Sequence, residues 1–136
     1  GQLTVLDKRI KARRVIFERY EKALGDVPGI GFMPEASYGQ SNRWLTVMTM
    51  DQAHTSITPM QLIEALEENN IEARPVWKPM HLQPLFANCM YFTHEDGVSI
   101  CDQLFASGVC LPSGSSLSVD DQQRVIQVIR RKLMGN

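Results

Sequence analysis

The stretch ITPMQLIEALEENN, Ile57–Asn70, carries the clearest secondary-structure signals in the sequence. Thr58 is a favourable N-cap, Pro59 suits the first helical position, and Gln61 completes a capping box. The asparagine pair at the end can take the left-handed conformation that stops a helix. The stretch therefore predicts a well-defined helix, around which the rest of the fold can be arranged.

Strand signals lie on both sides of this helix. The segment RWLTVMTMD, Arg43–Asp51, is rich in β-branched and aromatic residues and contains no Gly or Pro, which predicts a central strand. The segment IEARPV, Ile71–Val76, predicts a short strand that Pro75 ends, because proline cannot donate to a central ladder. A third strand is expected at VCLP, Val109–Pro112.

Three more helices are expected. Residues 3–24 repeat apolar side chains at helical spacing, although Arg13 interrupts the stripe, and the glycines and proline of GDVPGIG stop this helix. VSICDQLFAS predicts a short helix closed by Gly108. Ser118 caps a last helix, and the PSGSS turn before it is expected to be an ordinary helix entry rather than a phosphate-binding turn.

The resulting order is helix, strand, helix, strand, loop, helix, strand, helix. Two-residue hairpin signals are missing between the strands, so the helices are expected to cross over and pack on the sheet. The fold class predicted from this order is α/β, a two-layer sandwich with a small sheet of three or four strands.

The composition and charge of the chain argue against several classes of function. The chain has 136 residues, 43% hydrophobic and 21% charged, which suits one globular domain. A net charge of -1 gives no global signature for nucleic acid or an acidic membrane. The basic run KRIKARR, Lys8–Arg14, is expected to be a solvated helix face. No apolar run approaches the ~18 residues of a membrane span, and no signal peptide is recognisable, so a cytoplasmic protein is expected.

The three cysteines, Cys89, Cys101 and Cys110, lack CxxC spacing. This argues against a disulfide framework and against a structural zinc site. Cys89 and His94 could share a metal, but two ligands do not make a site. Buried reduced thiols and no metal are therefore expected.

Common catalytic motifs such as GxGxxG, P-loop, HExxH and GxSxG are absent. The segment RPVWKPMHLQPLF, Arg74–Phe86, stands out because three prolines exclude a helix interior or central strand, while it holds Trp77, Lys78, Met80 and His81. Two interpretations remain open from the residues alone: a binding loop, or a rigid apolar plug at the edge of the domain.

Four segments carry a resemblance to a known family: QLTVLDKRIKARRVIFERYEKAL, SNRWLTVMTMD, IEARPVWKPMHLQPLF and LFASGVCLPSGSSLSVDDQQRVIQVIRR. In this order they resemble the C-terminal part of the DegT/DnrJ/EryC1/StrS family of pyridoxal phosphate (PLP)-dependent aminotransferases, fold type I. The resemblance covers essentially the whole chain. It implies a small domain with a mainly antiparallel sheet, in which residues 1–25 form an interdomain helix and residues 26–136 the α/β sandwich.

The resemblance implies a function for the whole enzyme. Such enzymes transfer an amino group to a nucleotide-linked keto-sugar, with glutamate as the expected donor, and act as homodimers whose large domain binds PLP. The segment matching Arg74–Gln83 comes near the substrate, so the implied substrate-binding residues are His81, Lys78, Arg74, Trp77 and Met80, with Asn42 and Arg43 ranked second.

This chain departs from the family in one respect that bears on its activity. The aldimine lysine and the groups that hold the PLP ring and phosphate belong to the large domain, and none of the lysines here lies in that context. We therefore expect no catalytic residue in this chain, no cofactor bound to it, and no activity of the chain alone. The alternative is a stand-alone, non-catalytic binding domain of the same fold. Nucleic-acid and membrane partners are not expected.

Overall fold

A computed structural model describes residues 1–135 of the chain. Its centre is one sheet of four strands in the order β1-β2-β4-β3, and every neighbouring pair is antiparallel. The strands are β1 Ile30–Phe32, β2 Thr46–Met50, β3 Arg74–Pro75 and β4 Gly108–Leu111. The mainly antiparallel sheet and the α/β fold class predicted from the sequence are confirmed.

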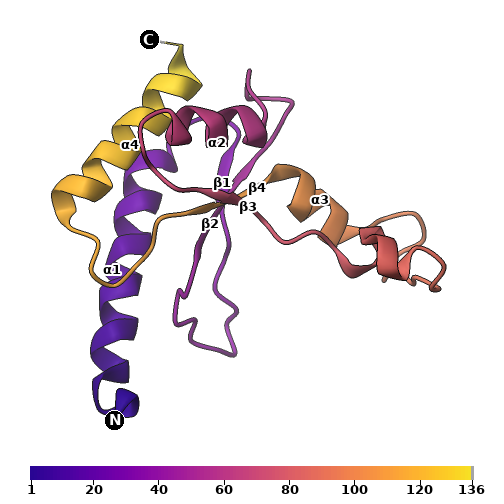
Figure 1. Cartoon of the computed structure of the whole chain (residues 1–136), viewed down its shortest axis with the longest axis horizontal. Coiled ribbons are helices and arrows are strands. Elements are labelled where there is room, and N and C mark those ends of the chain that lie inside the picture. The colour runs from indigo at the N-terminus through magenta and orange to yellow at the C-terminus, as the bar shows by residue number, and fades with distance from the viewer. Residues whose placement is uncertain (136) are drawn as a thin grey trace.

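Three helices form the second layer. They are α1 Leu6–Leu24, α2 Pro59–Glu67 and α4 Val119–Met134, and they lie on one side of the sheet (Figure 1). The shorter α3, Ile100–Ser107, is followed directly by β4 and extends away from these three helices (Figure 1). Within residues 1–135, no helix is long and apolar enough to cross a membrane.

The core lies between the sheet and this helical layer. Along β2, burial alternates with a period of two, and Met48 and Met50 are almost completely enclosed. All of β4 is buried, with Val109 and Leu111 in the core cluster. From the helices, Tyr20 and Ile129 are fully buried. The strand predicted at Arg43–Asp51 is shorter, Thr46–Met50, and it is central because it lies between β1 and β4.

The predicted start of α2 is confirmed in detail. The Thr58 hydroxyl accepts a hydrogen bond from the Gln61 backbone N–H, and the Gln61 side chain accepts one from the Thr58 N–H. Asn70, three residues beyond the helix, has φ 56°, the left-handed conformation expected for this end.

The structure corrects three predictions about local structure and burial. Strand β1 was not predicted, because its three residues follow a Gly/Pro-rich turn. The first helix is preceded by a 3-10 turn at Gln2–Val5, and the start of its apolar stripe, with Leu3 83% exposed, is not packed against the core. Of the three thiols expected to be buried, only Cys110 is; Cys89 and Cys101 are exposed.

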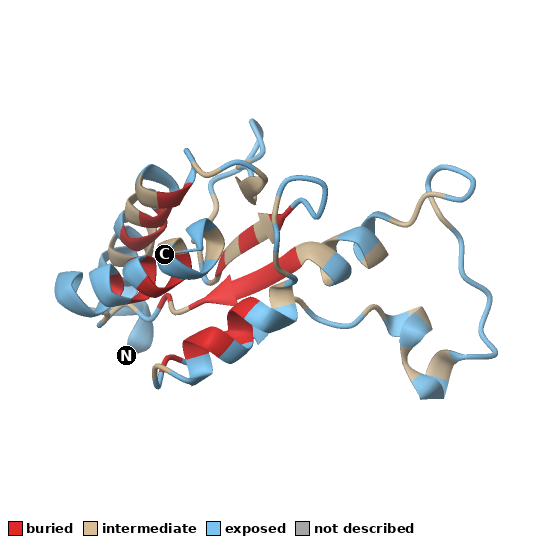
Figure 2. Ribbon diagram, turned by 90° about the horizontal axis from the view of Figure 1, so that it is seen from above, coloured by how far each residue is buried: buried red, intermediate tan, exposed pale blue. Residues whose placement is uncertain are grey.

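Cys89 and Cys101 are exposed because their part of the chain extends away from the core. Residues 77–99, here called the projecting loop, leave β3, pass through short 3-10 turns at Met80–Leu82 and Pro84–Phe86, and return through α3 to β4. Figures 1 and 2 both show this loop and α3 reaching away from the sheet, with exposed or intermediate residues along it. The segment singled out by its sequence therefore lies outside the core.

Candidate functional site

A wide hollow lies where β3 and β4 meet the start of the projecting loop. We call it the large cavity; its volume is about 820 Å³. Its lining includes charged and aromatic side chains, namely Arg13, Trp44, Glu72, Arg74, Trp77 and Lys78. Cys110 alternates along β4 with the core residues Val109 and Leu111, so its side chain lies on the other face of the sheet, where it lines this cavity.

The charged groups of the large cavity are mostly positive. The pairing of β3 with β4 sets the position of Arg74. Its guanidinium donates two hydrogen bonds to Glu72 Oε1, at 2.8 Å from Nε and at 2.5 Å from Nη2. Lys78 has no ion pair within residues 1–135, and Arg13 contacts carbonyl oxygens rather than a carboxylate. One carboxylate therefore faces three cations, which leaves the cavity able to attract an anion.

An aromatic pair forms one wall. The indole rings of Trp44 and Trp77 are stacked, with centroids 5.9 Å apart and planes 30° apart. They remain 59% and 63% exposed. Large aromatic rings left this open offer flat apolar faces to a ligand. They are also the two tryptophans of the chain.

Arg13 was not predicted as a site residue. Its Nη1 donates to the backbone oxygens of Trp44 and, at 3.3 Å, of Ser113, which joins α1 to the strand ends beside the cavity. The sequence carried a signal for it, because Arg13 is the charged residue that interrupts the apolar stripe of the first helix. Trp44 was also missed, since it was assigned only to a strand.

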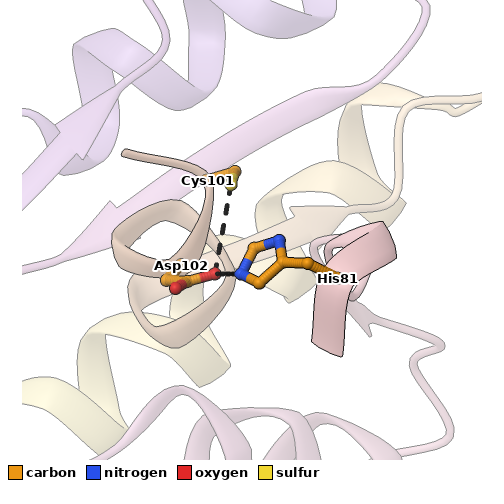
Figure 3. A group of neighbouring side chains, drawn as sticks. All are labelled: His81, Cys101 and Asp102. Carbon is orange, nitrogen blue, oxygen red and sulfur yellow. Dashed lines mark hydrogen bonds and ion pairs between the residues drawn. The ribbon is translucent and has the colours of Figure 1, made fainter. Parts of the chain in front are cut away.

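Met80 and His81 line a different hollow, here called the small cavity, of about 410 Å³ within the projecting loop. The imidazole of His81 stacks on Tyr91, with ring centroids 3.6 Å apart. Its Nε2 lies 2.9 Å from Asp102 Oδ1 (Figure 3). Hydrogen bonds with Ser99 and Tyr91 lower the pKa of the neighbouring Cys101 thiol.

Asn42 and Arg43 line neither cavity. The Asn42 side chain accepts a hydrogen bond from the Trp44 N–H at 2.9 Å. Arg43 has φ 47°, donates to the Met33 carbonyl at 2.7 Å, and lies 3.6 Å over the ring of Phe17. Both residues hold the turn before β2 in place. Their contact with substrate, like that of His81 and Met80, stays a prediction.

The residues of the large cavity do not make a PLP site. Such a site needs a lysine for the aldimine, a carboxylate at the pyridinium nitrogen and a phosphate cup around one ring. Among the described residues that line the cavity, Lys78 is the one lysine and Glu72 the one carboxylate, and Glu72 is already paired with Arg74. The cofactor is therefore not assigned to the large cavity.

Comparison with known proteins shows similarity to one family of aminotransferases. The profile of the DegT/DnrJ/EryC1/StrS aminotransferase family matches residues 1–130. EpsN of Bacillus subtilis (strain 168), assigned as a pyridoxal phosphate-dependent aminotransferase, is 52% identical over 129 residues, which cover 95% of this chain and 32% of that protein. GDP-perosamine synthase of Vibrio cholerae is 29% identical over 130 residues, 96% of this chain and 34% of that protein.

Solved structures agree on the fold. A DegT/DnrJ/EryC1/StrS aminotransferase from Brucella abortus superposes with a TM-score of 0.76 at 27% identity, over 96% of this chain and 33% of that one. The chain thus spans about a third of the length of the relatives it matches.

Proposed function

The chain belongs to the DegT/DnrJ/EryC1/StrS aminotransferase family, and we propose that it forms the C-terminal small domain of a PLP-dependent aminotransferase that acts on a nucleotide-linked keto-sugar. In this proposal residues 1–25 are the interdomain helix and residues 26–136 the α/β sandwich. A large domain holds PLP, which supplies the chemistry that carries the amino group.

The observation that carries the proposal is the large cavity. Arg74 and Lys78 offer charge-assisted hydrogen bonds of the kind that bind a diphosphate. The exposed faces of Trp44 and Trp77 suit stacking against a flat base or the apolar face of a sugar ring. Cations and open aromatic rings on one concave surface match the two halves of a nucleotide-linked sugar.

Each cavity residue has a distinct part in binding. Lys78, free of an ion pair in the described chain, supplies the charge that meets the phosphates. Arg74 is paired with Glu72, and both side chains are exposed, so its guanidinium stays accessible to an anion. Trp77 offers an exposed ring face on one side of the cavity. These residues bind and orient the substrate; the proton and amino transfers take place on the large domain's side.

Several further features belong to the same proposal. Glutamate is the amino donor, the whole enzyme is a cytoplasmic homodimer, and the 136-residue chain alone is inactive. The relative named for a GDP-linked sugar supports the substrate class, since that protein is similar over 96% of this chain.

Steady-state kinetics of the enzyme that joins this chain to its PLP-binding domain test the proposal. Lys78→Met keeps the apolar stem and removes the charge. A hydrogen bond to a charged group contributes roughly 1.5–3 kcal/mol, so KM for the nucleotide-linked sugar should rise about 10-fold or more. KM for the amino donor should not change.

Lys132→Met is the matched control, because Lys132 is an exposed lysine in the last turn of α4 and lines neither cavity. If Lys78→Met leaves KM for the nucleotide-linked sugar unchanged, the loop is a structural plug rather than a binding loop.

A further inference from the structure

Three side chains of different chemistry meet where the projecting loop lies against the start of α3. His81 comes from the 3-10 turn Met80–Leu82, while Cys101 and Asp102 come from the first turn of α3. One ligand atom from each lies within 4.8 Å of the others (Figure 3). We propose that His81, Cys101 and Asp102 bind a zinc ion. The proposal departs from the sequence-based expectation of no metal and does not depend on the proposed function.

The donor set suits zinc. Imidazole nitrogen, thiolate and carboxylate oxygen are the three ligand types that Zn²⁺ takes in proteins. With the usual bond lengths, a tetrahedral ion holds its ligand atoms about 3.3–3.7 Å apart. Here Nε2 of His81 is 2.9 Å from Oδ1 of Asp102, and Sγ of Cys101 is 3.9 Å from the same oxygen. The third separation, between Nε2 of His81 and Sγ of Cys101, lies within 4.8 Å, so shifts of up to about 1 Å would admit the ion.

The Nε2 atom of His81 is the clearest sign of a missing partner. The atom is buried and makes no hydrogen bond within the described chain, although Asp102 Oδ1 is 2.9 Å away. The carboxylate oxygen therefore lies off the axis along which the ring nitrogen donates or accepts. Two ligands of one ion have this relation, because both point at the metal rather than at each other.

Neighbouring groups support the ligands. Tyr91 Oη lies 3.0 Å and Ser99 Oγ 3.4 Å from Cys101 Sγ, so both hydroxyls are placed to donate to a thiolate. The Tyr91 ring also lies flat on the His81 imidazole and fixes its orientation. Such outer contacts orient ligands and strengthen metal binding.

The fourth position remains open. His81 and Cys101 both line the small cavity, together with Cys89, so water can reach an ion held there. Three protein ligands and one open position are a common arrangement for zinc. Binding converts the Cys101 thiol to a thiolate, whose proton goes to solvent, and affinity should therefore increase with pH.

Cobalt titration of the full 136-residue chain, stripped with a chelator, tests the proposal. Co²⁺ reports tetrahedral geometry through its visible bands and a thiolate ligand through charge-transfer absorption. One equivalent should bind with both signals, and Zn²⁺ should displace it. Cys101→Ser should remove the charge-transfer band, and Asp102→Asn should weaken binding at least about 10-fold.

Two control variants separate this site from its surroundings. Cys89→Ser removes the other exposed thiol of the small cavity, and His94→Gln removes an exposed histidine of the same loop. Both should bind Co²⁺ like the unaltered chain. Circular dichroism checks that the chain is folded. If the folded chain does not bind Co²⁺, His81 and Asp102 form only an ion pair and the proposal is overturned. A charge-transfer band that survives Cys101→Ser, or is lost in Cys89→Ser, would overturn it equally.

Discussion

The imidazole of His81 lies flat against the phenol ring of Tyr91, with centroids 3.6 Å apart and planes 12° apart. These residues are ten positions apart in the projecting loop, so their stacking closes it on itself. Tyr91 also contacts Ser99 and Cys101 at the start of α3 through its hydroxyl. The loop is thus organised around one aromatic pair, although it lies outside the core.

Tyr91→Leu should remove the ring current that acts on His81. The His81 ring protons should then move downfield in the NMR spectrum, toward the positions of an exposed histidine such as His94. Tyr91→Phe keeps an aromatic ring and should retain most of the upfield shift. Unchanged His81 resonances in Tyr91→Leu would mean that the two rings are not stacked in solution.

Thr58→Ala should destabilise the chain by about 1 kcal/mol, because it removes the side-chain acceptor of the α2 capping box. Urea denaturation followed by circular dichroism measures this difference. Ser56→Ala is the control, since Ser56 is exposed and outside the cap; its effect should stay within about 0.5 kcal/mol. Equal effects of the two substitutions would contradict the cap.

Tyr20→Phe should cost roughly 1–3 kcal/mol, because the fully buried Tyr20 hydroxyl donates to the Pro112 carbonyl at 3.0 Å and that oxygen would lose its partner. Tyr38, 95% exposed, provides the matched control. Tyr38→Phe should change the free energy of unfolding by less than about 0.5 kcal/mol. If both substitutions prove neutral, the contact between α1 and the segment after β4 does not contribute to stability.

Glu35 should make stability depend on acid pH. Its hydrogen bonds with the Arg14 guanidinium and the Ser41 N–H lower its pKa from 4.5 to about 2. A lowered folded-state pKa stabilises the native state above about pH 5, and this contribution is lost as the pH falls toward 2. Glu35→Gln should therefore be less stable than the unaltered chain at pH 7, and the difference should shrink on acidification.

Urea denaturation between pH 3 and pH 7 measures this trend. Glu67→Gln serves as the control, since Glu67 is exposed and forms no ion pair among the described residues. A difference between Glu35→Gln and the unaltered chain that stays constant over this range would show that the Arg14–Glu35 pair does not hold the carboxylate in its charged form.

Local sequence signals predicted those parts of the fold that local contacts determine. The cap at Thr58 and the helix start at Ser118 each depend on residues three positions apart, so the sequence displays them directly. Strand β1 could not be found in this way. It has three residues beside Gly29 and Pro28, and only its pairing with β2, about twenty positions away, makes it a strand.

The lining of the large cavity could be predicted only in part, again because sequence patterns report local contacts. Arg74, Trp77 and Lys78 are neighbours in the sequence and meet at one cavity, whereas Arg13 and Trp44 reach it from α1 and from the start of β2. No single-sequence pattern joins segments so far apart. The exposure of Cys89 and Cys101 was missed because a thiol is usually buried, and nothing local shows that this loop leaves the core.

Binding of the nucleotide part of a sugar substrate in the large cavity can be followed by tryptophan fluorescence, because both tryptophans of the chain line that cavity. The purified chain is titrated with GDP, UDP and TDP, and free tryptophanamide corrects for absorption by the ligand. We predict saturable quenching by at least one nucleotide, weakened in Lys78→Met and preserved in Lys132→Met. If none of the three nucleotides changes the fluorescence beyond the correction, or if Lys78→Met leaves the quenching intact, the large cavity does not bind the nucleotide in this way.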